Sequence, residues 1–417
     1  PGDKSISHRS IMLGAIAEGS SEIAGFLEGD DSLATLAAFR AMGVRIEGPD
    51  AGRVRVQGVG LHGLQQPETP LDLGNSGTSM RLLSGLLAGQ SFPSTLMGDI
   101  SLSARPMRRV TEPLALMGAR IQTAAEGTAP LRVEPAPVLR GVRYPMPVAS
   151  AQVKSCLLLA GLYAQGETCV VEPAPTRDHT ERMLAAFGYP VRRDDATVCV
   201  TGGGRLTACR LDIPADVSSA AFFLVGASIA PGSDLVLEHV GINPTRVGVL
   251  NILRQMGADI EVTNVRHAGG EPVADLRVRS ARLRGIRIPE DQVPLAIDEF
   301  PALFVAAACA EGETLLTGAE ELRVKESDRI QVMADGLKAL GVEAEPRPDG
   351  IRIRGGGYRG GSIDSCGDHR IAMSFAMAAL RSESAITIAN CANVNTSFPG
   401  FAALAAGAGL AIEAVRA

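Results

Sequence analysis

The chain has 417 residues, a length that suits about two domains of roughly 200 residues each. Hydrophobic residues make up 46% of the chain and charged residues 21%, which excludes an intrinsically disordered protein because such a composition can bury a large core. The net charge of −6 and the absence of Trp argue against nucleic-acid binding, which relies on basic surfaces with interleaved aromatic side chains.

Neither a membrane span nor a secretory signal is evident. No apolar stretch reaches the roughly 20 residues that a transmembrane helix needs, and no Lys/Arg-led signal segment opens the chain, so we expect a cytoplasmic protein without a membrane partner. Because the chain begins with Pro1 rather than Met, we expect natural N-terminal residues to precede it. The seven cysteines are widely spaced and form no C-x-x-C pair, which predicts reduced thiols rather than a disulfide framework or a zinc site.

A weak internal repeat organises the sequence. An apolar residue, a glycine, two variable residues and a second apolar residue recur six times, and successive glycines lie 75, 70, 69, 84 and 68 residues apart. Glycine suits the left-handed position that closes a helix, so each copy predicts a helix end followed by a strand. The six glycines are Gly43, Gly118, Gly188, Gly257, Gly341 and Gly409.

A second feature repeats in step with the first: a polar turn followed by a helix rich in Ala, Leu, Ser and Gly. Two of these helices, within 220–229 and 302–310, carry no charge, which predicts helices buried on all sides. Each repeat therefore consists of strands with one central and one peripheral helix. The polar turns lie near Asp3, Asn75, Ser150, Asp216, Asp298 and Gly367.

Six repeats divide naturally into two groups of three. We expect one domain over residues 4–212 and a second over 213–417 together with 1–3. The polar helix starts predict anion sites, since free N–H groups and a partial positive charge lie at helix N-termini. Simple N-capping is the alternative explanation for Ser76, Asp216 and Ser218.

Four segments carry more polar residues than capping requires. The first places Lys4 and Ser5 at a helix start, with Arg9 one turn further on the same face. Residues 73–81 contain two glycines that permit close approach of a ligand to the backbone, and residues 105–109 contain three arginines.

The fourth segment, residues 322–329, is dense in charge and places Glu326 and Arg329 at a helical i,i+3 spacing; a solvated charged face is its alternative explanation. Asp298 precedes an otherwise apolar helix, where a carboxylate must cap, pair or catalyse. The histidines lack metal-ligand spacing, and neither a Walker A loop nor a dinucleotide fingerprint is present. We therefore expect no metal and no organic cofactor.

These segments together closely resemble the 5-enolpyruvylshikimate-3-phosphate synthase family, in the right order from Gly2 to about Phe401. The resemblance implies an α/β fold: a two-domain inside-out α/β barrel of six βαβαββ repeats, three per domain, with the active site in the inter-domain cleft. The motifs that carry it are Lys4-Ser5…Arg9, Gly74-Asn75-Ser76-Gly77-Thr78, Gly98-Asp99…Arg105-Pro106-Met107, Ser150-Ala151-Gln152, Asp298-Glu299-Phe300-Pro301, Arg323 to Arg329 and Asp368-His369-Arg370.

The family's reaction, a step of the shikimate pathway to chorismate and the aromatic amino acids, transfers the enolpyruvyl group of phosphoenolpyruvate to the 5-hydroxyl of shikimate 3-phosphate and needs no cofactor. The resemblance makes Asp298 the proton acceptor and Glu326 the proton donor, with Lys4 and Lys325 as further catalytic residues. Shikimate 3-phosphate is then bound by Lys4, Ser5, Arg9, Ser150, Ala151, Gln152, Arg177, Asp298 and Lys325. Phosphoenolpyruvate is bound by Lys4, Asn75, Gly77, Arg105, Gln152, Glu326, Arg329, His369 and Arg370.

The resemblance also implies that Gly77 leaves room for the inhibitor glyphosate and that the partners are small substrates only, for a protein we expect to be monomeric. The chain departs from one subgroup of the family at residues 176–179 and near Thr396, where that subgroup has a Lys. A rival is the sister enolpyruvyl transferase acting on UDP-N-acetylglucosamine, many members of which carry a Cys before the Arg-Pro pair; residues 100–104 contain none. A non-catalytic scaffold for phosphorylated ligands is the second rival, disfavoured by the presence of both Asp298 and Glu326.

Overall fold

A computed structural model describes residues 1–415 of the chain, which folds into two compact units. The first unit contains residues 2–214 and 267–271; the second contains residue 1, residues 215–266 and the chain from 272 onward. Each unit has a separate hydrophobic core. Residues 2–3, which we expected in the second group, therefore lie in the first unit, as does the segment 267–271.

Six central helices begin where the polar turns predict them, three in each unit. Their bodies are almost entirely buried, as the lack of charge in α8 and α11 predicts. A side chain caps each helix except α11, whose N-cap residue Glu299 makes no such bond. The central helices are α1 (Lys4–Ala15), α3 (Gly77–Ala88), α6 (Ala151–Gly161), α8 (Val217–Ile229), α11 (Phe300–Cys309) and α13 (His369–Ala378).

The six repeat glycines each lie two residues beyond the end of a peripheral helix. All six have left-handed backbone angles, with φ between 75° at Gly188 and 102° at Gly409. The predicted helix ends are thereby confirmed, because a residue with a Cβ is strained in this conformation. The peripheral helices are α2 (Asp30–Ala41), α5 (Arg108–Leu116), α7 (His179–Ala186), α9 (Gly248–Gln255), α12 (Arg329–Ala339) and α14 (Phe401–Gly407).

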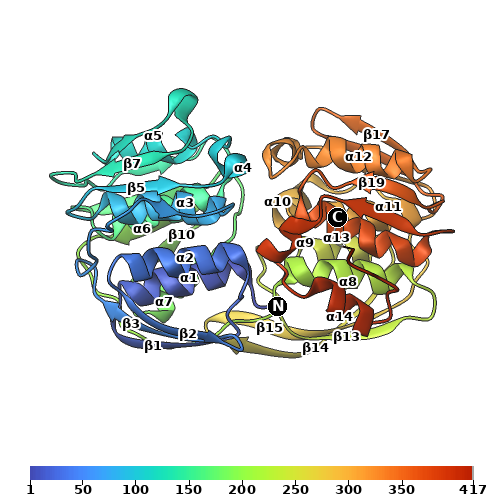
Figure 1. The fold of residues 1–417 in the computed structure, drawn as a ribbon, viewed down its shortest axis with the longest axis horizontal. Helices are drawn as coiled ribbons and strands as arrows, with labels where there is room; N and C mark the ends of the chain where they lie inside the picture. Colours follow the sequence, from blue (N-terminus) through green and yellow to red (C-terminus); the bar gives the residue numbers. More distant parts are fainter. Residues whose placement is uncertain (416–417) are drawn as a thin grey trace. The chain divides into compact units, whose positions relative to one another are not determined.

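Three four-stranded sheets form the outer layers of the first unit, and one of them lies against α1 and α2 in Figure 1. In each sheet one edge strand, here called the leading strand, runs parallel to its neighbour, and the other strand pairs are antiparallel, which gives a βαβαββ order. The leading strands are β12, β4 and β8. The sheets are β12 (Arg210–Asp212), β1 (Glu18–Ala24), β3 (Arg53–Val59), β2 (Arg45–Asp50); β4 (Leu71–Asp72), β5 (Ser94–Met97), β7 (Leu131–Glu134), β6 (Arg120–Gln122); and β10 (Arg192–Asp194), β11 (Thr197–Thr201), β9 (Glu167–Val171), β8 (Arg143–Pro145).

The first sheet takes its leading strand, β12, from the far end of the unit, so it joins the two ends of the segment 2–214. The second unit repeats the plan with fewer strands in each sheet, because some leading strands are reduced to isolated bridges such as Ala215 with Val240. Its sheets are β13 (Asp234–Gly241), β15 (Glu271–Arg279), β14 (Asp259–Ala268); β16 (Glu313–Leu316), β18 (Gly350–Arg354), β17 (Glu343–Arg347); and β19 (Gly361–Asp364), β20 (Ile386–Ala389).

Two short helices complete the pattern, α4 (Ile100–Ser103) and α10 (Val293–Ala296). Within residues 1–415, no helix combines the length and the apolar character needed to cross a membrane. The candidate site is formed by the polar residues at the starts of the central helices.

Candidate active site

The first turns of the central helices in the first unit are joined by side-chain hydrogen bonds. Arg9 of α1 donates to the hydroxyl of Ser155 on α6 at 2.8 Å, and Arg81 of α3 donates to Oε1 of Gln152 on α6 at 2.6 Å. Since these residues are the second to sixth of their helices, the three N-termini lie at the same end of the unit. Three partial positive charges at one end favour the binding of anions there.

Lys4 is the first residue of α1, and buried Asp3 caps this helix by accepting a hydrogen bond from the backbone N–H of Ile6 at 2.9 Å. The Lys4 ammonium donates to Oδ2 of Asp31 at 2.6 Å, and 18% of its side chain is exposed. Ser5 is half-buried beside it. Lys4 thus presents a partly exposed positive charge at a helix N-terminus.

Arg9 lies deeper and connects three helices. Only 4% of the residue is exposed. Its Nη1 donates to the carbonyl of Ser5 at 2.9 Å, its Nε donates to Thr180 of α7 at 2.7 Å, and Ser155 receives the third bond. In this structure Arg9 therefore orders the base of the site, and its direct contact with a substrate stays a prediction.

Around the start of α3, Asn75 connects a carboxylate and a guanidinium. Its amide nitrogen donates to Asp99 at 2.8 Å, and its oxygen accepts from Nη2 of Arg105 at 2.7 Å. A Cβ atom on Gly77 would lie 3.2 Å from Nη1 of Arg105 and 3.0 Å from Nη1 of Arg81. Two guanidinium groups thus lie close to the backbone of this glycine, and a side chain at position 77 would crowd both of them.

The start of α6 carries the third set of predicted residues. Ser150 caps the helix by accepting from the N–H of Val153 at 3.4 Å, and Ala151 is its first residue. The Gln152 amide donates to the hydroxyl of Thr78 at 3.1 Å while its oxygen is bound to Arg81. Gln152 therefore connects the N-termini of α3 and α6.

Arg177 follows a loop that a buried ion-pair network holds in place. Fully buried Lys154 contacts Glu172 at 2.9 Å and Glu181 at 2.7 Å. Glu172 also accepts a hydrogen bond from the backbone N–H of Thr176 at 3.1 Å. Removing one partner of such a buried network destabilises a protein strongly, so the backbone that positions half-buried Arg177 is well fixed.

In the second unit, Arg329 is the centre of a cluster of carboxylates. Its side chain is 1% exposed, and it donates to Asp368 at 2.8 Å and to Glu326 at 2.6 Å. Its Nη1 lies 3.3 Å from Oδ1 of Asp298. A single guanidinium therefore holds together both predicted proton-transfer residues and a third, fully buried carboxylate.

Asp298 also interacts with two other predicted residues. The Lys325 ammonium lies 3.6 Å from its Oδ1, and Arg370 donates to its backbone carbonyl at 3.1 Å. Asp298 lies two residues before α11, where Glu299 occupies the N-cap position. Of the three possibilities left open by the sequence, pairing is the one that these contacts show.

The buried charges shift each other's pKa values. Burial lowers the pKa of the Arg329 guanidinium, but attraction to Asp368, Glu326 and Asp298 is stronger and keeps that pKa above its ordinary value. Burial raises the pKa of Asp368, but Arg329 and His369 together bring it below its ordinary value. Both groups are therefore charged at neutral pH. His369 itself is buried at the start of α13, which Asp368 caps.

Two cysteines contradict the expectation of reduced thiols throughout the chain. Cys169 and Cys199 form a disulfide between β9 and β11. The two cysteines are 30 residues apart in the sequence. This spacing does not predict the disulfide, because the pairing depends on the register of two strands. Cys156, Cys209, Cys309, Cys366 and Cys391 are free thiols, as expected.

Comparison with known proteins decides the family. A family model described as EPSP synthase (3-phosphoshikimate 1-carboxyvinyltransferase) matches residues 1–404. The chain belongs to the EPSP synthase family. The 3-phosphoshikimate 1-carboxyvinyltransferases of Methylococcus capsulatus and Alkalilimnicola ehrlichii are each 71% identical over 413 residues, which is 99% of this chain and 94% and 93% of theirs.

Solved EPSP synthase structures support the same conclusion. One from Acinetobacter baumannii has a TM-score of 0.90 and 61% identity, covering 99% of this chain and 95% of its own. The expected two-domain α/β fold is thereby confirmed, and the match decides against the sister enolpyruvyl transferase as the family of this chain.

Three residues contribute to these clusters although the sequence assigned them no role of their own: Asp31, Arg81 and Asp368. Each is a buried polar residue at the N-cap or within the first five residues of a helix. A polar residue near a helix start is a weak signal, because the sequence does not show whether its side chain is buried. Thr396, where one subgroup of the EPSP synthase family was expected to differ, ends a short 3-10 helix and donates to the carbonyl of Asn393 at 2.7 Å.

Proposed function

We propose that this chain transfers the carboxyvinyl group of phosphoenolpyruvate to the 5-hydroxyl of shikimate 3-phosphate and releases phosphate. Membership of the EPSP synthase family, with a match over residues 1–404, supports this proposal. The observation that carries it is the position of Arg329, which holds the two carboxylates that the reaction needs, Asp298 and Glu326, within hydrogen-bonding or ion-pair distance.

The first unit supplies the binding of anions in this proposal. Shikimate 3-phosphate and phosphoenolpyruvate each carry a phosphate and a carboxylate, so binding must neutralise several charges. Shikimate 3-phosphate contacts the starts of α1 and α6 and the loop after β9, and phosphoenolpyruvate contacts Asn75, Gly77 and Arg105. The grouped helix N-termini and the cations beside them support this division. The proposed contacts to shikimate 3-phosphate are Lys4, Ser5, Arg9, Ser150, Ala151, Gln152 and Arg177.

The second unit supplies the two proton transfers. Asp298 accepts the proton of the 5-hydroxyl as the oxygen bonds to C2 of phosphoenolpyruvate, and Glu326 delivers a proton to C3. The neighbouring Lys325 and Arg329 stabilise the carboxylate form of Asp298, which a proton acceptor requires. The tetrahedral adduct then loses phosphate and a proton from C3, which restores the vinyl group on the new ether.

Glu326 has the opposite requirement, because it must carry a proton to donate one. In the structure its carboxylate is paired with Arg329 at 2.6 Å. The incoming phosphate and carboxylate of phosphoenolpyruvate compete for Arg329 and bring negative charge nearby, and both effects favour the protonated form of a carboxyl group. We propose that phosphoenolpyruvate, also held by His369 and Arg370, thereby makes Glu326 an acid.

Release of inorganic phosphate tests the proposal. The enzyme is incubated with phosphoenolpyruvate alone, with added shikimate 3-phosphate, and with added UDP-N-acetylglucosamine. We expect release only with shikimate 3-phosphate. Release that depends on the UDP-sugar, or no release with either acceptor, contradicts the proposed reaction.

A further inference from the structure

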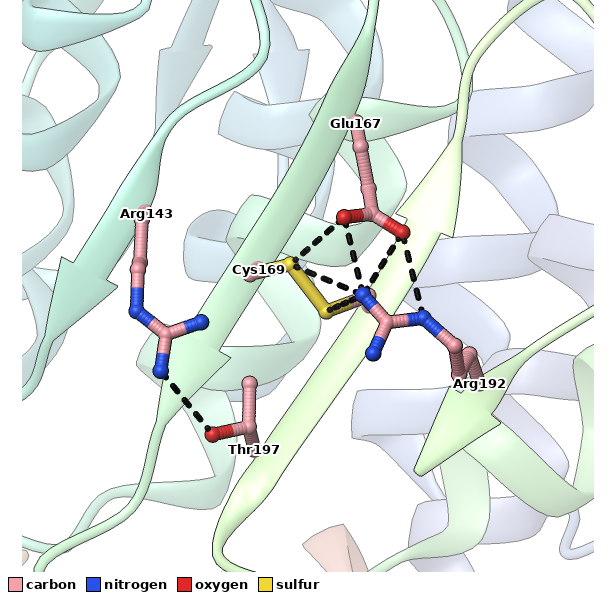
Figure 2. Close-up of a disulfide and its surroundings, with 6 residues drawn as sticks. Arg143, Glu167, Cys169, Arg192 and Thr197 are labelled. Atoms are coloured by element: carbon pink, nitrogen blue, oxygen red, sulfur yellow. Dashed lines mark hydrogen bonds and ion pairs between the residues drawn. A yellow bond between two sulfur atoms is a disulfide. The ribbon is translucent and has the colours of Figure 1, made fainter. Parts of the chain in front are cut away.

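A row of cysteines and arginines crosses the outer face of one sheet in the first unit (Figure 2). In the strand register, Cys199 of β11 lies opposite Cys169 of β9, Arg192 of β10 lies opposite Cys199, and Arg143 of β8 lies opposite Cys169. Residues opposite one another point to the same face of a sheet. The disulfide is therefore flanked on both sides by an arginine.

The spacing of the two cysteines follows from their positions in the sheet. The backbone N–H of Cys169 donates to Val142 on the β8 side, so the cysteines form the narrow, non-hydrogen-bonded type of antiparallel pair. The backbone α-carbons of the two residues are 4.1 Å apart. Because the sheet itself sets this distance, the disulfide can open and re-form without a change of register.

Two charged side chains cover the sulfur atoms. Nη2 of Arg192 lies 3.2 Å from Sγ of Cys199 and 3.9 Å from Sγ of Cys169, and the same nitrogen donates to Glu167 at 2.9 Å. Oε2 of Glu167 lies 3.2 Å from Sγ of Cys169. The cysteines are almost fully buried, whereas the Arg192 and Glu167 side chains are 55% and 42% exposed.

A hollow of about 480 Å³ opens beside the disulfide. Cys199, Arg192 and Glu167 form one part of its wall, and Tyr189 with residues 201–204 forms another. Cys169 is not part of the wall. A small molecule that enters the hollow therefore lies against Arg192 and Glu167, the two side chains that cover the sulfur atoms, with Cys199 behind Arg192.

Glu167, Cys169 and Cys199 also have the donor types of a metal site, with their ligand atoms within 4.8 Å of one another. The position of Arg192 disfavours that use. Its guanidinium binds the Glu167 carboxylate and contacts the Cys199 sulfur, so a positive charge already occupies the space where a cation would bind.

We propose that the Cys169–Cys199 pair is a thiol–disulfide exchange site for small anionic thiols, with Cys199 as the sulfur that is attacked. The thiolate of the small molecule forms a bond to Sγ of Cys199 while the bond to Cys169 breaks, and Cys169 leaves as a thiolate that takes a proton from water. A second small thiolate attacks the sulfur of the first, which forms the small-molecule disulfide and releases Cys199 as a thiolate beside Arg192. Two small thiols are oxidised and one protein disulfide is reduced.

The neighbouring charges predict opposite effects on this exchange. Arg192 attracts the anionic thiol and stabilises the Cys199 thiolate, whereas Glu167 repels the thiol and the Cys169 leaving group. Because Arg192 and Glu167 are about half exposed, we expect changes of about twofold to fivefold in rate. Arg192→Gln slows reduction by glutathione, and Glu167→Gln accelerates it.

The test uses the folded full chain in glutathione buffers of different redox ratio, followed by alkylation and mass spectrometry of the peptides that contain Cys169 and Cys199. We expect both cysteines to convert together between disulfide and dithiol. In Cys169→Ser, oxidised glutathione should form a mixed disulfide on Cys199. Full alkylation of both cysteines even in oxidised glutathione overturns the proposal, as does a disulfide that is reduced only after unfolding.

Selectivity for anionic thiols is tested by comparing glutathione with neutral 2-mercaptoethanol. Arg192→Gln should lower the ratio of the two rates, whereas Arg210→Gln should leave it unchanged. Arg210 is the matched control, an exposed arginine on β12 paired with Glu22 at 2.9 Å. An equal change of both rates in Arg192→Gln refutes the selectivity. Stoichiometric zinc binding by the reduced protein that is lost in Cys169→Ser overturns the exchange site in favour of a metal site.

Discussion

We expect replacement of Gly77 by Ala at the start of α3 to weaken substrate binding while the protein still folds. The new methyl group would lie 3.0 Å from Nη1 of Arg81 and 3.2 Å from Nη1 of Arg105, both shorter than ordinary van der Waals contact. The backbone has no left-handed conformation at this position, so Ala fits the helix itself. The two guanidinium groups must therefore move by a few tenths of an ångström.

The size of the effect follows from what these groups bind. A hydrogen bond to a charged group contributes about 1.5–3 kcal/mol, and each 1.4 kcal/mol corresponds to about a tenfold change in affinity. Displacing one such contact should raise the KM for phosphoenolpyruvate by about 10- to 100-fold. Stability should change by less than about 1 kcal/mol, because the preference for Ala over Gly in a helix is opposed by the close contacts with Arg81 and Arg105. Inhibition by glyphosate, which the family resemblance predicts, should weaken in parallel.

The assay is phosphate release against phosphoenolpyruvate concentration at saturating shikimate 3-phosphate, with urea unfolding of the same samples. Gly14→Ala is the control, because a Cβ at this buried position of α1 meets its nearest neighbour at 3.4 Å. The reasoning fails if Gly77→Ala leaves the KM unchanged, or if Gly14→Ala raises it equally.

Two further variants address the second unit. Asp298→Asn removes the proton acceptor with little change of shape, so turnover should fall at least about 100-fold while binding of phosphoenolpyruvate, measured by calorimetry, persists; an unchanged turnover number removes Asp298 from this role. Asp368→Asn leaves Arg329 without its closest buried partner and should lower the free energy of unfolding by about 3–5 kcal/mol at neutral pH. Because the pKa of Asp368 is depressed in the folded state, this contribution is complete above the unfolded carboxyl pKa of about 4 and disappears as pH falls further; a difference between wild type and variant that stays constant down to pH 2 contradicts it.

Local signals in the sequence predicted much of the fold. The repeat glycines, Gly43 and Gly409 among them, adopt the left-handed conformation that ends a helix, and this requirement depends only on neighbouring residues. The polar residues before each central helix predicted its start for a similar reason, because capping is local. The spacing of the glycines predicted six repeats in two groups of three, and the family resemblance then supplied the βαβαββ order of strands and helices within each repeat.

Contacts between distant segments could not be predicted in this way. The bond between Arg81 and Gln152 joins residues 71 positions apart, and Arg329 reaches Asp368 across 39 positions. The pairing of Cys169 with Cys199 depends on the register of two strands. A shift of one strand by one residue would place the two side chains on opposite faces of the sheet. These contacts arise only when helices and strands pack, so a pattern within one segment carries no signal for them.

The proton supplied by Glu326 is the most direct point at which to test the mechanism. In D₂O with shikimate 3-phosphate present, wild-type enzyme should incorporate deuterium at C3 of phosphoenolpyruvate as the addition step forms and reverses. Glu326→Gln should bind phosphoenolpyruvate but incorporate deuterium at least about 100-fold more slowly, the usual contribution of a general acid. Incorporation at the wild-type rate in Glu326→Gln would show that another group delivers the proton and would contradict the roles assigned around Arg329.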